Sequence, residues 1–361
     1  MPIRVVQWAT GAVGRFCLQQ IIDDPNLQLV GLWVSGPAKE GKDAGELCDR
    51  PATGISATTS IEDIVALDAD VVVHTSAPFG DFDGHVARLL ASGKNIVSTC
   101  AYFSLRVDGE AVQRQMEQAC EEGGSTLFGA GLDPGFVCDR VPALMTGSVT
   151  DITRIEMAET LDVSTYAAPE LLTDIGFGKQ LTDVKFDNEY VQHFVVRLFP
   201  AAIGKLATQL GLELDEVRPT GMPEFTYATK DLDTAIGHIA KGTISGACHE
   251  MGGYRNGELI VSHKWVHFAE RGGCPDGWPM PPEPRPGEVM PYRVLVEITG
   301  RPSLSVDMVY NDIEDTVFLP TATVTVRSIP YVVSAPPGIL TESVFGAWSA
   351  GAAPVSVRGH A

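Results

Sequence analysis

The sequence predicts an α/β fold in which a doubly wound parallel sheet is joined to an α+β domain with a mostly antiparallel sheet. Three observations predict it. The chain opens with an apolar strand, a glycine turn and a helix; apolar strands and helices then alternate up to about residue 130; and from about residue 151 the strands alternate apolar and polar residues. The first two patterns are typical of a doubly wound sheet, and the third is typical of half-buried antiparallel strands.

The first strand runs directly into a glycine turn. Residues 3–8 are rich in β-branched side chains, and the turn reads A-T-G-A-V-G before a helix at 15–23 and a second apolar strand at 27–34. This A-x-G-x-x-G form lacks the first glycine of the full dinucleotide-binding (Rossmann) fingerprint, but its position in a βαβ unit supports the assignment. Because a helix N-terminus binds anions, we expect a pyrophosphate at Thr10, Gly11, Ala12, Val13 and Gly14.

The alternation continues through three more pairs of helix and strand, which we expect at 60–67, 70–75, 83–92, 95–99, 108–122 and 126–130. Ligands of such sheets lie beyond the carboxyl ends of the strands. We therefore expect further cofactor contacts at Thr75, Ser76, Ala77, Thr99, Cys100, Asp133 and Pro134. Asp133 can touch a nicotinamide carboxamide there, or it can cap a helix that begins at Pro134, and both roles are compatible.

The second half of the chain predicts a separate lobe. Strands are expected at 243–251, 258–268, 292–298 and 303–309, with a hairpin at Asn256-Gly257 and one helical stretch at 188–210. The proline- and glycine-rich loop 272–291 is interpreted as a lid. The segment 312–340 is expected to be partly helical, with a break at Pro320, and to pack back on the first lobe. The predicted domains are residues 1–134, completed by 311–361, and a substrate and dimerisation domain at 135–310.

Composition narrows the classes of function. The formal charge of -20, from 26 basic and 46 acidic residues, argues against nucleic acid or an anionic membrane as partner. The seven cysteines form no C-x-x-C pair, which fits reduced thiols. The chain shows neither a signal peptide pattern nor an apolar run of about 20 residues. We therefore expect a cytoplasmic protein that acts on a small molecule.

The end of the second strand bears on the choice of nicotinamide cofactor. An NAD site usually places a carboxylate there to bind the ribose 2′-hydroxyl. This strand ends in L-W-V-S-G, the first carboxylate after it is Glu40, and Ser35, Lys39 and Lys42 lie close by. A hydroxyl and a lysine suit a 2′-phosphate, so NADP is expected, with NAD as the alternative. Both lysines are equally compatible with an ordinary solvated loop.

Three segments carry a family resemblance: the turn at 9–14, the loop G-A-G-L-D-P-G-F at 129–136, and the stretch at 164–178, together with A-P-P-G at 335–338. On these residues the chain resembles the dihydrodipicolinate-reductase-like family that includes 2,4-diaminopentanoate dehydrogenase and the native amine dehydrogenases. The resemblance implies a Rossmann domain completed by the C-terminal helix, an intervening substrate domain, and a homodimer. The paired-histidine motif of true dihydrodipicolinate reductases is missing, so their activity is not expected.

The resemblance also implies a glutamate after the strand expected at 95–99, where the amine-forming members handle ammonia or an iminium ion. This chain has Ala101 and Tyr102 there. Reduction of C=O or C=N needs a proton donor or a charge stabiliser near the heteroatom, and the candidates are Tyr102, Tyr166 and Glu159, with Asp162 beside the last. Each has an ordinary alternative, since a tyrosine can be part of an apolar wall and a carboxylate can be a solvated strand residue.

Histidines and aromatic residues of the second lobe complete the list of candidates. His263 and His267 would lie about 13 Å apart on a strand, so no metal site is expected, although one of them can line the pocket. The aromatic residues Trp265, Phe268, Trp278 and Tyr292 favour an apolar, uncharged substrate region.

The sequence thus predicts an NAD(P)H-dependent oxidoreductase that reduces C=N or C=O of an apolar carbonyl compound, in the manner of an amine dehydrogenase. Two alternatives stay open. The first is a carbonyl reductase or alcohol dehydrogenase without ammonia chemistry, and the second is a non-catalytic NADP(H)-binding sensor. Turnover with and without ammonium separates the three.

Overall fold

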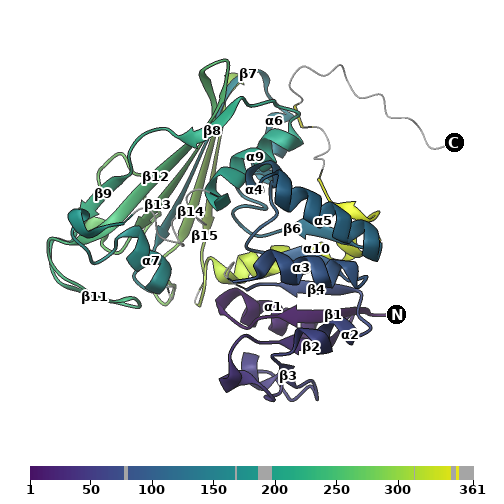
Figure 1. The fold of residues 1–361 in the computed structure, drawn as a ribbon. Helices are drawn as coiled ribbons and strands as arrows, with labels where there is room; N and C mark the ends of the chain where they lie inside the picture. Colours follow the sequence, from purple (N-terminus) through teal and green to yellow (C-terminus); the bar gives the residue numbers. More distant parts are fainter. Residues whose placement is uncertain (77–79, 167–168, 186–196, 313, 343–346, 349–361) are drawn as a thin grey trace.

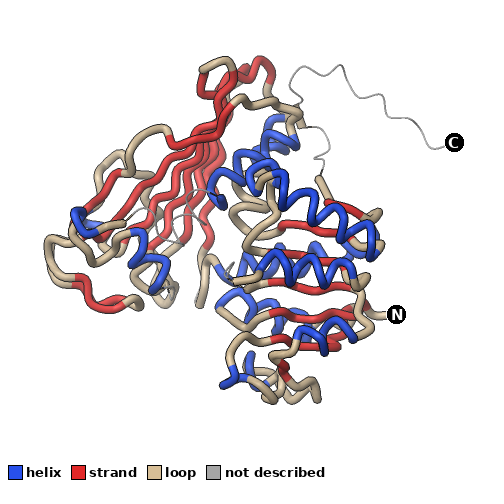
Figure 2. Tube along the Cα trace, in the orientation of Figure 1, coloured by secondary structure: helices blue, strands red, loops and turns tan. Residues whose placement is uncertain are grey.

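Two lobes make up the molecule, one built on a parallel sheet between layers of helices and the other on a long open sheet (Figure 1). The computed structural model describes residues 1–361 apart from 77–79, 167–168, 186–196, 313, 343–346 and 349–361. Figure 2 shows the two sheets approaching each other beside the helices of the first lobe. The α/β fold class expected from the sequence is confirmed.

The first sheet is parallel throughout, with strand order β16-β6-β5-β4-β1-β2-β3. Its strands are β1 (Ile3–Trp8), β2 (Leu27–Trp33), β3 (Ala57–Thr58), β4 (Val71–His74), β5 (Asn95–Ser98), β6 (Thr126–Gly129) and β16 (Gly338–Ile339). The strand order reverses between β1 and β4, where doubly wound sheets bind their ligands. The carboxyl ends of these strands are therefore the edge at which we expect the cofactor, and this edge is called the cofactor edge below.

Helices cover both faces of the first sheet. One face carries α2 (Ile61–Ala66), α3 (Phe82–Ala91), α4 (Leu105–Asp108) and α5 (Glu110–Gly123), and the other carries α1 (Ala12–Asp23) and α10 (Phe318–Ser334). Buried aliphatic side chains fill both layers, because strands covered on two faces must be apolar on both. None of the described helices is long and apolar enough to cross a lipid bilayer.

The second sheet has strand order β15-β14-β7-β13-β12-β8, with β9 also paired to β12. Its strands are β7 (Thr150–Asp162), β8 (Glu216–Pro219), β9 (Glu224–Tyr227), β12 (Ile244–Arg255), β13 (Glu258–Phe268), β14 (Tyr292–Arg301) and β15 (Leu304–Tyr310). All pairs are antiparallel except β7 with β13, which are parallel. A small hairpin of β10 (Leu232–Thr234) and β11 (Gly237–Ile239) stands apart from it.

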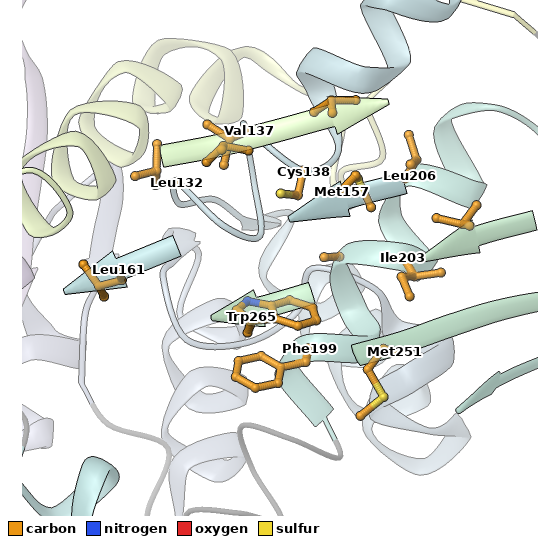
Figure 3. Packing of buried hydrophobic residues seen from close by; sticks show 14 of the residues in the cluster. Leu132, Val137, Cys138, Met157, Leu161, Phe199, Ile203, Leu206, Met251 and Trp265 are labelled. Carbon is orange, nitrogen blue, oxygen red and sulfur yellow. The ribbon is translucent and has the colours of Figure 1, made fainter. Parts of the chain in front are cut away.

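The inner face of the second sheet packs on short helices and on the loop after β6. Among the described residues, the α-helices of this lobe are α6 (Arg140–Thr146), α7 (Pro169–Ile175) and α9 (Phe199–Gln209). The helical stretch expected at 188–210 is found only as α9, since 186–196 lie outside the described residues. Figure 3 shows the resulting core, with Trp265 of β13 over the ring of Phe199 of α9, their centroids 4.1 Å apart.

The expectation that the loop 272–291 forms a lid is wrong. The loop crosses the outer face of the second sheet, where Trp278 is buried against Cys248 and Val266. Thr160 donates a hydrogen bond to the carbonyl of Pro279, and Arg293 donates one to that of Met280. These side chains alternate with those of the inner face, so the loop covers the side of the sheet away from the first lobe.

The expected helix break at Pro320 is also wrong. Helix α10 runs from Phe318 to Ser334 without interruption at this proline. Pro320 lies in the first turn, where its missing N-H has no helical partner to lose. The segment does pack back on the first lobe, because α10 lies against α1 and β16 pairs with β6.

Candidate active site

The turn between β1 and α1 is shaped for close approach of a phosphate. Ala9 has a left-handed φ of 74°, and a Cβ on Gly14 would lie 2.4 Å from the Ala9 carbonyl oxygen and 2.7 Å from Thr75 Oγ1. Gly11 is the N-cap of α1 without a capping side chain, and a Cβ there would meet no protein atom within 4 Å. The first N-H groups of α1 are thus free to bind an anion, which fits the pyrophosphate of a dinucleotide.

Thr75 braces this turn from the neighbouring strand end. Its hydroxyl donates to the carbonyl of Trp8 at 2.9 Å and accepts from the Gln7 amide at 2.9 Å, while the same amide also donates to the carbonyl of Ala9. The turn between β1 and α1, called the phosphate turn below, is therefore preorganised by buried hydrogen bonds.

The structure brings the other expected cofactor residues to one edge. Ser76 follows β4, Thr99 and Cys100 follow β5, and Asp133 and Pro134 follow β6. Parallel strands end at the same side of a sheet, so these residues share the edge with the glycine turn. Ala77 lies outside the described residues. His74, at the end of β4, is buried, and burial lowers its pKa to about 3, so that its ring is neutral between the hydroxyls of Ser76 and Ser98.

The two lysines after β2 differ in position. Lys39 Nζ donates to both the carbonyl and the hydroxyl of Thr10 at 3.0 Å, which places its charge at the phosphate turn. Lys42 instead lies 3.6 Å from a carboxylate oxygen of Glu46. Ser35 is exposed beside the strand end. Of these two lysines, it is therefore Lys39 that contacts the turn between β1 and α1.

A cavity of about 120 Å³ lies between the cofactor edge and the inner face of the second sheet. Its walls are apolar apart from one polar end. It is lined by Leu132, Asp133, Glu159, Leu161, Val163, Tyr166, Leu172, Ile175, Leu198, Phe199, Trp265, His267, Tyr292, Val317 and Thr321. The cavity therefore contains two of the three candidate proton donors, Glu159 and Tyr166.

Glu159 of β7 lies at the polar end of this cavity. It is 8% exposed, it accepts a hydrogen bond of 2.5 Å from the hydroxyl of Tyr292, and its other oxygen is 3.8 Å from His267 Nε2. Burial, and then the charge of Asp133, raise the pKa of Glu159. A carboxyl group in this position carries a proton more readily than a solvated one.

Asp133 enters the same cavity from the loop after β6. Its side chain is 3% exposed, and His263 Nε2 lies 3.1 Å from Oδ2. Burial, and then the charge of Asp139, raise the pKa of Asp133 to about 7. The sequence predicts a role of Asp133 at the cofactor, and the structure adds a position at this cavity.

Tyr166 reaches from the second lobe toward the cofactor edge. Its ring stacks on Phe318 of α10 with centroids 4.6 Å apart. Burial, and then the nearby Glu159, raise the pKa of Tyr166, so that its hydroxyl stays protonated and can donate. Tyr166 and Glu159 thus face the same space.

Tyr102 is not brought together with Glu159 and Tyr166. Its hydroxyl donates to Asp83 at 2.6 Å, its ring stacks on Phe82, and it is 4% exposed within the first lobe. The left-handed φ of 67° at Tyr102 turns the chain under α3, and Ala101 is buried in the same core. The position of Ala101 and Tyr102 after a strand end does not by itself predict the direction of their side chains. Asp162 is also elsewhere, bonded to the N-H of Ser164.

Several residues that line the cavity belong to no recognisable sequence motif. His267 does line it, as one of the two histidines was expected to, and so do Trp265 and Tyr292, whereas Trp278 lies on the outer face. These residues could not be assigned to the cavity from the sequence, because the parallel register that sets Glu159 beside Trp265 joins strands that are distant in sequence. The usable signal was the spacing of two residues among His263, Trp265 and His267.

Comparison with known proteins agrees with this geometry. The family model for the N-terminus of dihydrodipicolinate reductase matches residues 3–118. An amine dehydrogenase from Streptomyces virginiae is 31% identical over 328 residues, which cover 86% of each chain. This chain belongs to the amine dehydrogenase family. As a member, it is an NAD(P)-dependent oxidoreductase, as expected from the sequence.

Two further relatives of this amine dehydrogenase homologue span nearly its whole length. A 2,4-diaminopentanoate dehydrogenase from Acetoanaerobium sticklandii is 22% identical, over 94% of this chain and 92% of the relative. The structure of an amine dehydrogenase from Mycobacterium smegmatis superposes with a TM-score of 0.74 at 18% identity, over 94% of this chain and 95% of that one. This superposition shows that the two proteins share one fold over both lobes.

Proposed function

We propose that this amine dehydrogenase homologue catalyses the reductive amination of a small, apolar ketone or aldehyde, and its reverse, with Glu159 as the group that handles the proton and the positive charge. The observation that carries the proposal is the buried Glu159 at the polar end of an otherwise apolar cavity beside the cofactor edge. It supplies from the second lobe a carboxyl group that Ala101 does not supply from the first.

The lining of the cavity supports a neutral or cationic reactant. The described residues that line the cavity include neither Lys nor Arg, but they include both Asp133 and Glu159. A substrate carboxylate would be repelled there, whereas an ammonium or iminium group is attracted by a carboxylate in a site of low polarity. The volume of about 120 Å³ suits a compact substrate.

The raised pKa of Glu159 suits both halves of the proposed reaction. In its protonated form, Glu159 donates a proton to the departing oxygen, and in its ionised form it stabilises the iminium carbon–nitrogen bond before reduction. Tyr292 fixes one carboxyl oxygen by its hydrogen bond, and His267 lies beside the other. The nicotinamide cofactor supplies the hydride when bound. Tyr166 donates from the opposite side toward the heteroatom.

For the cofactor we propose NADP(H) rather than NAD(H). Lys39 lies at the phosphate turn, Ser35 is exposed beside it, and the strand end offers no carboxylate for a ribose 2′-hydroxyl. The expected contacts Thr10, Gly11, Ala12, Val13, Gly14, Ser76, Thr99, Cys100 and Pro134 belong to this proposal. A homodimer and a cytoplasmic location, both expected from the sequence, stay predictions that light scattering and cell fractionation would test.

The deciding experiment is NADPH and NADH oxidation by the purified protein with small aliphatic and aromatic ketones and aldehydes, each with and without a high ammonium concentration. We expect turnover that depends on ammonium. Turnover that is independent of ammonium would instead identify a carbonyl reductase, for which the hydroxyls of Tyr166 and Tyr292 offer proton donors. Cofactor binding without any turnover would overturn both.

A further inference from the structure

Three potential metal ligands meet behind the wall of the substrate cavity. Asp133 and Cys138 come from the loop between β6 and α6, and His263 comes from β13. One oxygen, the sulfur and one nitrogen of these residues all lie within 4.8 Å of one another. Figure 3 shows Cys138 deep in the core near Met157. The topology therefore gathers an oxygen, a sulfur and a nitrogen donor from two distant segments.

The polar atoms of this cluster lack hydrogen-bond partners. Neither ring nitrogen of His263 and neither carboxyl oxygen of Asp133 makes a hydrogen bond with the described residues, although His263 is fully buried and the Asp133 side chain is 3% exposed. Asp133 Oδ2 and His263 Nε2 lie 3.1 Å apart, but the geometry of this contact is not that of a hydrogen bond. Buried polar groups are bonded in the large majority of cases. A carboxyl oxygen and a ring nitrogen that lie near the sulfur of Cys138 without a hydrogen bond therefore indicate a missing ligand.

We propose that Asp133, Cys138 and His263 bind a divalent metal ion of the zinc type. Thiolate, imidazole and carboxylate are the donors that zinc combines in proteins, with bonds of about 2.0 to 2.3 Å. Such bonds hold the donors about 3.5 Å apart, so side-chain movements of about 1 Å close the site. The mixed donor set excludes magnesium and calcium, which take oxygen ligands.

Charge balance supports the same conclusion. Without a cation, Asp133 and Cys138 are two acids buried beside Glu159, and burial raises the pKa of the Cys138 thiol. A divalent ion neutralises one thiolate and one carboxylate while His263 binds as neutral imidazole, the form that burial favours. Binding releases the thiol proton, and the carboxyl proton where present, to solvent. Affinity for the ion therefore rises with pH.

The location of this metal cluster gives it a second consequence. Asp133 also lines the substrate cavity, and the charge of Glu159 acts on Cys138. An ion in the cluster would hold the loop after β6 against β13, and its fourth coordination position would be available to water. The inference does not rest on the proposed reaction, because it concerns binding rather than turnover.

The test uses the full chain, freed of metal with a chelator and titrated with Co²⁺, which reports tetrahedral geometry by visible bands and sulfur ligation by a near-ultraviolet charge-transfer band. We expect about one ion per chain, displaced by Zn²⁺. The C138S variant should lose the charge-transfer band, and C138S and H263Q should each weaken binding by at least about tenfold.

Matched controls come from the same molecule. Cys120 is a fully buried cysteine in the first lobe, and His249 is a buried histidine on the neighbouring strand β12, so C120S and H249Q should bind Co²⁺ as the wild type does. Each variant is first checked for cooperative unfolding and NADPH binding, and C138S decides the matter if H263Q does not fold. Absence of Co²⁺ binding by folded wild type, or a charge-transfer band retained in C138S, would overturn the proposal. Metal binding without turnover would leave it standing while the proposed function fails.

Discussion

The two lobes place their polar groups in opposite ways. In the first lobe, the strands β1, β4 and β5 are buried on both faces by aliphatic side chains, and groups that can bind a ligand gather at the strand ends. In the second lobe, the inner face of the sheet itself buries Glu159, His249, His263 and His267. Backbone geometry thus prepares the first lobe for a ligand, whereas the second lobe relies on buried side chains.

This difference between the lobes indicates that the buried functional groups of the second lobe lower the stability of the folded state. Backbone N-H groups at a helix end bind a phosphate without burying a charged side chain. Carboxyl groups enclosed in a core instead destabilise the folded state unless they keep a proton or gain a positive partner. The following changes test this contrast, from the largest expected effect to the smallest.

Replacing the carboxyl group of the second lobe should nearly abolish turnover. For Glu159→Gln we expect kcat to fall by about 10² to 10⁴, because a positioned acid contributes on this scale, while NADPH affinity is unchanged. The measurement is steady-state kinetics with ammonium, beside cofactor titration. Glu250→Gln is the control, since Glu250 lies on β12 next to Thr220 and Lys264. A folded Glu159→Gln variant with kcat close to wild type would remove Glu159 from the mechanism.

Asp133→Asn should change how stability depends on pH. The native pKa of about 7 lies above the unfolded value, so the native state holds the proton more tightly, and stability is lost as pH rises from about 4 through 7. Without metal, the variant should therefore gain about 3 kcal/mol on wild type between pH 5 and pH 8. Urea unfolding with a chelator at both pH values measures this gain.

For a carboxylate of the first lobe, we expect the stability to change with pH in the opposite direction. Backbone N-H groups of Thr53, Gly45 and Gly54 bind Asp43 and lower its pKa, with Thr53 the largest cause. Asp43→Asn should therefore be more destabilising at pH 8 than at acidic pH. If both variants shift stability in the same direction with pH, the contrast between the lobes is wrong.

The phosphate turn should tolerate no negative charge. Gly11→Asp should fold, since a Cβ there meets no protein atom, but should weaken NADPH binding by about 100-fold or more because its carboxylate repels the pyrophosphate. Fluorescence titration of NADPH measures the loss. Gly272→Ala, another glycine with open space but on the second lobe, should bind NADPH normally. Unchanged affinity in Gly11→Asp would refute the turn as the cofactor site.

Cofactor preference should depend on a single lysine. Lys39→Ala is expected to weaken NADPH binding by about tenfold, the worth of one hydrogen bond to a charged group, and to affect NADH less. Lys42→Ala is the control because Lys42 is engaged with Glu46. Equal losses for both cofactors would assign Lys39 to the pyrophosphate instead of a 2′-phosphate.

Sequence alone could predict the first lobe because its signals are local. The glycine turn, the strand ends and the return of the C-terminal segment each follow from residues close together in sequence or from a familiar pattern. The sequence also proposes Glu159 and Tyr166, and both line the cavity. Tyr166 lies in a segment that carries the family resemblance, whereas Glu159 is a carboxylate on the first strand of the second lobe. The direction of Tyr102 was not, because it depends on a single left-handed residue within an apolar loop.

The polar cluster of the second lobe could not be predicted for a different reason. Asp133, Glu159 and His263 come from three segments. Glu159 and His263 lie near each other because β7 and β13 pair in parallel within a mostly antiparallel sheet, and Asp133 joins them from the loop after β6. The loop 272–291 was misread because its composition suggests mobility, whereas the burial of Trp278 anchors it to the sheet. Composition reports neither a pairing partner nor the face that a loop covers.

The pairing of β16 with β6 constrains the order in which the chain can assemble. The edge strand and the covering helix α10 of the first sheet are separated from β6 by the entire second lobe. During synthesis from the N-terminus, the first lobe exposes the face that α10 will cover and the free edge of β6 until residue 339 has emerged. The second lobe is complete by then, so that the cofactor-binding half, although it is made first, is finished last.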